Sequence, residues 1–160
     1  MPTLRKSELK TTRVMSQAKF ERFFQLAAGL DMDKKDLKRY SDFVNQKTYD
    51  LLIRGKATAK ANRRDIIDPW DLPITKGLQE RIHEFKEIDE EIELTPILNY
   101  MAERRPPDLT CSVETEAELP TIVGGLSVAL ARCFKIIDPA VKNPQTAQWE
   151  RAFHIFDLLL

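Results

Sequence analysis

The stretch from Lys34 to Ala61 constrains the fold most, because no proline interrupts it. Its apolar side chains recur at helical spacing. They are Leu37, Tyr40, Phe43, Val44, Leu51 and Leu52. A helix of about 28 residues would be roughly 42 Å long, more than a compact unit of about 80 residues can bury by itself. We therefore expect other helices to lie across it.

Residues on either side of this stretch predict where helices begin and end. Asp33 is a typical N-cap, and Asp36 stands three residues later, where it can bond back to the cap. An earlier helix is predicted from Ser16 to Gly29, with Phe20, Phe23, Phe24, Ala27 and Ala28 on its apolar face. The polar residues 1–15 predict a flexible or loosely docked basic tail.

The segment "RRDIIDPWDLP", residues 63–73, holds three aspartates among two prolines and a tryptophan. Three carboxylates could bind a hard cation, but apolar residues and Pro69 interrupt their spacing. Asp68 is better explained as a cap before Pro69. We expect an extended "DIID" segment, no metal, and a third helix over residues 72–85. The acidic residues 84–93 predict a solvated helix end or connector.

The second half repeats this order of short, long and medium helices without a residue-level repeat. A short helix is expected within residues 94–105, a long one over residues 115–137 and a terminal one over residues 146–160. We expect the glycines at positions 55, 124 and 125 to let the two long helices approach closely. Trp70 and Trp149 are expected to pack beside the third helices.

Equal numbers of basic and acidic residues hide a division of charge along the chain. The chain has 25 of each, but residues 1–64 hold 16 Lys and Arg against 7 Asp and Glu, a net charge of +9. The remainder therefore carries −9. A basic half could contact an acidic partner such as nucleic acid. Alternatively, the two halves neutralise each other when packed.

Motifs of catalysis and cofactor binding do not occur in the sequence. There is no P-loop, GxGxxG, nucleophile elbow or HExxH. Cys111 and Cys133 form no CxxC pair, and no local pair of zinc ligands is formed among these cysteines, His83 and His154. The apolar runs are shorter than a membrane span, and no signal-peptide pattern opens the chain. We expect a non-enzymatic cytoplasmic protein with free thiols, no cofactor, no metal and no membrane contact.

Residues 16–85 resemble archaeal histones. Arg64 aligns with the arginine that ends the long helix of that family, Asp71 with the aspartate that opens the third helix, and Ile67 with the short strand between them. Residues 68–79, "DPWDLPITKGLQ", are similar to a stretch in a largely uncharacterised prokaryotic family of tandem histone-fold proteins.

The resemblance implies an all-α protein with two histone-fold units, residues 16–86 and residues 87–160. The two units would cross in a handshake within one chain, so that a monomer suffices. It also implies that Arg64 and Asp71 form a structural clamp, for which bidentate Arg–carboxylate geometry is well suited.

Archaeal histones wrap double-stranded DNA without reading its bases, and this function transfers only in part. Arg22 matches a phosphate-binding arginine, whereas Asp31 and Asp65 stand where that family has cations. The DNA-binding candidates are Lys19, Arg22, Lys34, Lys35, Lys60 and Arg63. We expect weak, sequence-independent DNA binding by a nucleoid-associated protein. The alternative is a protein-interaction or assembly module that does not bind DNA.

Overall fold

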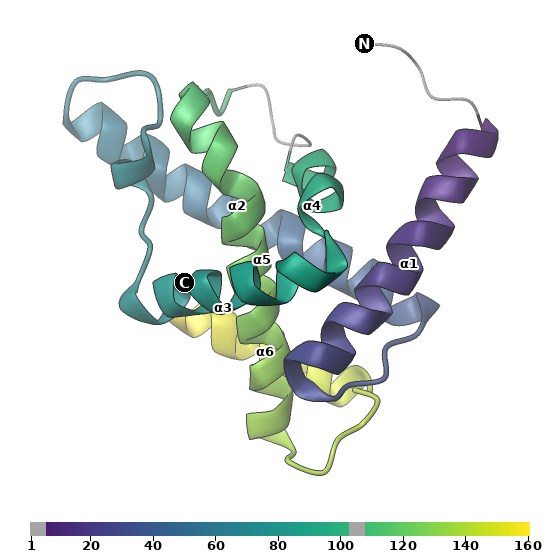
Figure 1. Ribbon diagram of the computed structural model, residues 1–160. Helices are drawn as coiled ribbons and strands as arrows, with labels where there is room; N and C mark the ends of the chain where they lie inside the picture. Colours follow the sequence, from purple (N-terminus) through teal and green to yellow (C-terminus); the bar gives the residue numbers. More distant parts are fainter. Residues whose placement is uncertain (1–5, 103–107) are drawn as a thin grey trace.

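The computed structural model describes residues 6–102 and 108–160, and within these ranges all the regular elements are helices (Figure 1). They are α1 (Lys6–Ala28), α2 (Lys34–Ala61), the 3-10 turn η1 (Pro69–Asp71), α3 (Lys76–Ile92), α4 (Thr95–Ala102), α5 (Val113–Ile137) and α6 (Thr146–Leu159). The predicted all-α class is confirmed.

Helix α1 begins at Lys6, ten residues before the predicted start at Ser16. The backbone of residues 6–15, which were expected to form a flexible or loosely docked tail, is therefore helical, and residues 1–5 lie outside the described residues. The physical reason is that residues 6–28 contain neither proline nor glycine, so polar helix formers extend the helix beyond its apolar face. Gly29 ends it as predicted, with a positive φ of 62°.

Helix α2 has the predicted bounds and the predicted capping box. The Asp36 amide donates to Asp33 Oδ1 at 3.0 Å, and the Asp33 amide donates to Asp36 Oδ2 at 2.9 Å. These bonds satisfy two amides that the helix itself leaves without partners. The backbone bond to Asp36 is the main reason that the pKa of Asp33 is lowered.

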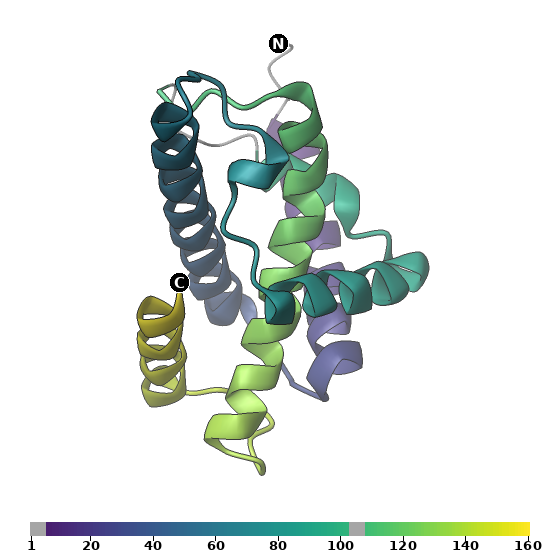
Figure 2. The same ribbon diagram turned by 90° about the vertical axis from the view of Figure 1, so that its left-hand side faces the viewer.

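Helix α5 is the centre of the molecule. Figure 2 shows α2 and α6 on one side of it, α1 and α4 on the other, and α3 crossing it. In length and composition α5 is apolar enough to span a membrane, with a mean hydropathy of 1.5 over its most apolar window. However, 67% of that window is buried within the fold. Its place at the centre of the core therefore accounts for its composition.

Gly124 and Gly125 of α5 allow α3 to pack closely against this helix. The prediction that they would allow a close approach of α2 was wrong. A Cβ added at Gly124 would lie 2.2 Å from the Phe85 ring, and one at Gly125 would lie 2.5 Å from Ile82 Cγ1. Gly55 of α2 likewise makes room for Ile67 and not for another long helix. The long helices instead meet through a polar contact, in which the hydroxyls of Tyr40 and Ser127 lie 2.6 Å apart.

The third helix begins and ends later than predicted. Thr75 caps α3, because Leu72 precedes Pro73 and residues before proline avoid helical backbone. The helix then continues through the acidic segment to Ile92, so the predicted boundary between residues 86 and 87 lies inside it. Glu93, with a φ of 55°, ends α3 and begins the second half.

Candidate functional site

The loops at the ends of the long helices pair across the two halves of the chain. We call residues 62–75 with residues 108–112 the first loop pair. Its centre is a parallel bridge between Ile67 and Cys111. The Ile67 amide donates to the Thr110 carbonyl at 2.9 Å, and the Ile67 carbonyl accepts from the Ser112 amide and from Thr115 Oγ1.

The arginine clamp, formed by Arg64, Asp68 and Asp71, holds the first loop pair. Arg64 donates to both oxygens of Asp71, at 2.6 and 2.7 Å, and to Asp68 at 2.7 Å. The Asp71 side chain is fully buried, and it also accepts from the Asp68 amide at 2.8 Å. The hydrogen bonds from Arg64 are the main reason that the pKa of Asp71 is lowered. Asp71 closes the turn η1 and does not open α3 as the resemblance implied.

Trp70 is not the packing residue that was predicted. Its side chain is 75% exposed, and the guanidinium carbon of Arg64 lies 6.0 Å from the centre of its ring. The turn that begins at Pro69 directs Asp71 and Leu72 inward, which leaves Trp70 outside. Ile66, just before the buried Ile67, is also exposed. Trp149 does pack in the core as predicted.

The second loop pair joins residues 29–33 to residues 138–145. The Asp31 amide donates to the Lys142 carbonyl at 2.6 Å, and Asn143 Nδ2 donates to the Asp31 carbonyl at 2.5 Å. Buried Asp36 accepts from Trp149 Nε1 at 2.9 Å and from Asn143 Nδ2 at 3.2 Å. A carboxylate of the first half thus fixes the second loop. Sequence reasoning found Asp36 only as a helix cap, since no local motif indicates a partner so distant in the chain.

Four of the six candidate DNA-binding cations lie at the two ends of α2. Lys34 and Lys35 are exposed at the start of α2, and Lys60 and Arg63 are exposed at its end, about 40 Å away. Two further candidates on α1 are engaged with acidic segments. Lys19 Nζ donates to the Glu93 carbonyl at 3.2 Å, and Arg22 lies 4.0 Å from Glu91.

Each loop pair also carries an exposed aspartate. Asp31 lies in the second pair, near Lys34 and Lys35 in the chain, and Asp65 lies in the first, near Lys60 and Arg63. Cations and anions therefore alternate at both ends of α2.

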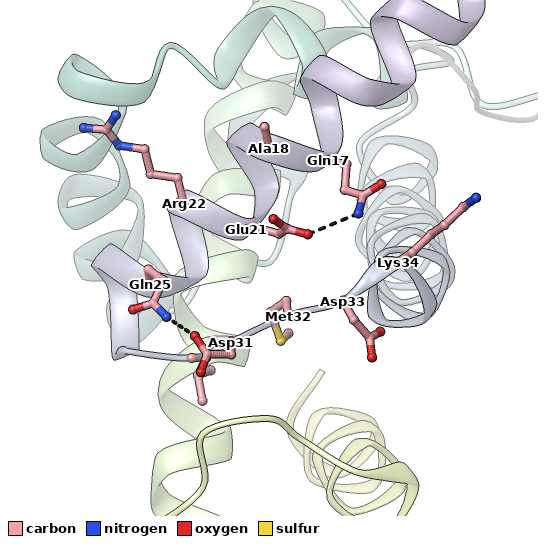
Figure 3. Close-up of a pocket in the computed structure, with 10 residues that line it drawn as sticks. Gln17, Ala18, Glu21, Arg22, Gln25, Asp31, Met32, Asp33 and Lys34 are labelled. Atoms are coloured by element: carbon pink, nitrogen blue, oxygen red, sulfur yellow. Dashed lines mark hydrogen bonds between the residues drawn. The ribbon is translucent and has the colours of Figure 1, made fainter.

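A hollow of about 550 Å³ lies between α1 and the loop before α2 (Figure 3). Its charged lining is mixed, with Arg22 and Lys34 beside Glu21, Asp31 and Asp33. The lining contains no histidine, cysteine or serine that could act as a nucleophile or neutral base. In Figure 3, Gln25 bonds to Asp31 across the hollow. The hollow is thus a groove of mixed charge between α1 and the loop before α2.

The thiols and imidazoles are scattered. Cys133 is buried, which raises the pKa of its thiol, and Cys111 is half-buried at the bridge. His83 and His154 are exposed on α3 and α6. Within residues 6–102 and 108–160, no three His, Cys, Asp or Glu residues gather as metal ligands would.

These features define an all-helical protein whose two halves are joined by a loop pair at each end of the long helix α2. The chain belongs to the family described as a domain of unknown function, DUF1931, which matches residues 20–157.

Similar proteins come from Thermus thermophilus and Aquifex aeolicus. A crystal structure from Thermus thermophilus is 52% identical and superposes with a TM-score of 0.78 over 89% of this chain and 97% of that one. A 1.9 Å crystal structure of an Aquifex aeolicus protein, 24% identical, has the same fold, with a TM-score of 0.78 over 91% and 95% of the two chains. An uncharacterized protein of Aquifex aeolicus (strain VF5) is 27% identical, covering 84% of this chain and 86% of its own.

Proposed function

We propose that this chain is a non-enzymatic histone-fold pseudodimer that binds double-stranded DNA weakly and without sequence preference, as a cytoplasmic nucleoid-associated protein. The crossed loop pairs carry the proposal. In a handshake of two histone-fold units, each loop beside a long helix pairs with a loop of the other unit. Here Ile67 pairs with Cys111 and Asp31 bonds to Lys142, so both pairs join one half to the other.

The arrangement supports a pseudodimer within a single chain. Helices α1, α2 and α3 are followed by α4, α5 and α6, and each half has its longest helix in the middle. Asp36 fixes the loop of the opposite half, and Thr115, in the first turn of α5, does the same through its bond to the Ile67 carbonyl. One chain supplies both halves, so the proposed form in solution is a monomer.

The distribution of charge supports weak DNA binding. Exposed cations stand at both ends of α2, where they can contact phosphates at two separated points. Asp31 and Asp65 stand at the same loops and repel phosphate. Such binding depends on a few lysines and arginines and therefore weakens steeply with salt.

The test is a titration of a fluorescent 30-base-pair duplex with the full chain, from about 20 mM salt upward, where contacts are least screened. We expect binding at low salt and a linear fall of log affinity with log salt. The double variants Lys34→Glu with Lys35→Glu, and Lys60→Glu with Arg63→Glu, should each weaken binding and flatten this slope. Absence of wild-type binding at the lowest salt contradicts the proposal.

The matched control changes the same charge elsewhere. Lys86 and Arg151 are exposed within α3 and α6, outside both loop pairs. The double variant Lys86→Glu with Arg151→Glu has the same net charge as the other two, so it separates local phosphate contact from general repulsion. An equal loss in all three double variants would mean that the loop pairs are not the DNA-binding surface.

A protein-interaction module is the alternative function, and the exposed aspartates Asp31 and Asp65 at the loop pairs favour it, because they oppose phosphate contact. It predicts a stoichiometric protein partner that remains bound after nuclease treatment. It also predicts that DNA binding is absent at every salt concentration.

A further inference from the structure

The most exposed aromatic side chain among the described residues stands at the first loop pair. Trp70 is 75% exposed and Ile66 is 48% exposed, whereas Trp149 is buried. An exposed indole presents a large apolar surface to water, and with the exposed Ile66 on the same loop it offers a candidate contact surface.

The loop beneath Trp70 is held from several directions. Pro69 restricts the backbone, the Asp68 amide is bonded to Asp71, and Ile67 is paired with the opposite half. Arg64 connects the two exposed residues, because it donates to the Ile66 carbonyl at 3.4 Å and lies against the Trp70 ring. A contact made by this loop therefore requires little loss of conformational entropy.

The small size of this apolar surface favours DNA over a folded protein as its partner. A stable protein interface buries about 800 Å² on each side and surrounds its apolar centre with a polar rim. Here the exposed large apolar side chains of the described residues are only Trp70, Ile66 and, at the start of α5, Val113. They lie beside charged residues of both signs, Lys60, Arg63 and Asp65. A wedge that enters between base pairs needs only one or two apolar side chains.

The charges of the first loop pair also fit a duplex. Lys60 and Arg63 are exposed and can contact the phosphates beside an inserted side chain, although Asp65 reduces this attraction. Unstacking a base step costs free energy, which the added contacts of a bent duplex offset.

We propose that Trp70, supported by Ile66, acts as a rigid apolar wedge that partly unstacks a base step and bends the bound duplex. This inference rests on the proposed DNA binding and specifies how the first loop pair takes part in it. It implies a preference for flexible pyrimidine–purine steps, because these are the easiest to unstack.

The experiment compares the wild-type chain with Trp70→Ala, Trp70→Leu and Leu159→Ala. Leucine retains an apolar wedge, and Leu159 is a matched control because it is also 75% exposed, at the end of α6. Affinity and its salt dependence are measured on a 30-base-pair duplex and on a single strand of the same length. Bending is measured by energy transfer between dyes at the duplex ends.

We expect Trp70→Ala to weaken duplex binding about tenfold and to abolish the bend, the size expected for loss of one stacked aromatic contact. Its salt slope should stay that of the wild type, since no charge is removed. Trp70→Leu should keep most of the duplex affinity and most of the bend. Leu159→Ala should change neither the affinity nor the bend. The tryptophan fluorescence of the wild type should be quenched when the duplex binds. In Trp70→Leu the fluorescence comes from buried Trp149 alone.

Different failures have different meanings. If the wild type binds the duplex but Trp70→Ala binds it equally well, the wedge is wrong and the proposed function stands. If the wild type binds no DNA at about 20 mM salt, the proposed function fails and the wedge fails with it. Equal losses on single strands without a bend would indicate a stacking platform and overturn the wedge. Self-association that Trp70→Ala abolishes, with DNA affinity unchanged, would make this surface a protein interface and exclude the wedge.

Discussion

Trp149 and Asp36 lie 113 positions apart in the chain, yet the indole Nε1 donates to the carboxylate at 2.9 Å. Both residues are buried. The bond joins the last helix to the first turn of α2, so the two halves share a polar contact inside the core. A buried carboxylate that loses a donor pays for its desolvation, which gives this contact a measurable effect on stability.

Trp149→Phe should destabilise the fold by about 1–3 kcal/mol, because it removes one donor to Asp36 while keeping an aromatic ring. The packing of the ring against Phe134, at 4.8 Å between centroids, is largely retained. Urea unfolding measures the difference. The matched control is Trp70→Phe on the surface, which should stay within about 0.5 kcal/mol of the wild type. Equal effects of the two variants would contradict a structural role for the bond.

The arginine clamp should make the stability of the fold decrease at acidic pH. Because Arg64 lowers the pKa of Asp71, the clamp stabilises the folded state above the unfolded pKa of about 3.9. This contribution is lost as the pH falls through the folded pKa. Asp71→Asn should therefore be less stable than the wild type at pH 7, and the gap should narrow below about pH 4. A gap that stays constant from pH 7 to pH 3, measured by thermal unfolding, would argue against the charged clamp.

Gly124→Ala should destabilise the protein by about 1–3 kcal/mol, because the new methyl group would overlap the buried Phe85 ring. The control is Gly77→Ala in α3, where an added Cβ meets nothing within 4 Å. That variant should be stabilised by about 0.5–1 kcal/mol through helix propensity alone. Thermal melts of the two variants should therefore shift in opposite directions. Stabilisation of both would show that α3 does not cross α5 at this glycine.

Burial raises the pKa of Tyr40 to about 12. In the unfolded chain this phenol ionises near its ordinary pKa of 10.0, so the unfolded state loses the proton at a lower pH than the folded state. Tyr40 therefore contributes stability that is complete below pH 10 and declines between that value and about 12. Tyr40→Phe should therefore remove the part of the stability loss at alkaline pH that comes from ionisation of this phenol. Unfolding midpoints at pH 9 and pH 11 test it, and an unchanged pH dependence in the variant would contradict it.

The sequence by itself was sufficient for the local elements whose signals lie within a few residues. The capping box of α2, the stop at Gly29 and the all-α class follow from short-range hydrogen bonding and apolar periodicity. Arg64 and Asp71 are also close in the chain, and the resemblance to archaeal histones predicts the pairing that is observed.

Only the tertiary structure decided the rest, because it depends on which surfaces meet. The sequence predicts that Gly124 lies where the two long helices cross, but in the structure it lies where α3 crosses α5. Asp36 looked like a cap alone until the fold brought Trp149 to it. Trp70 and Trp149 are the same residue type, yet one is exposed and the other buried. Local propensity acts over a few residues, whereas burial and long-range hydrogen bonds are set by the packing of the whole chain.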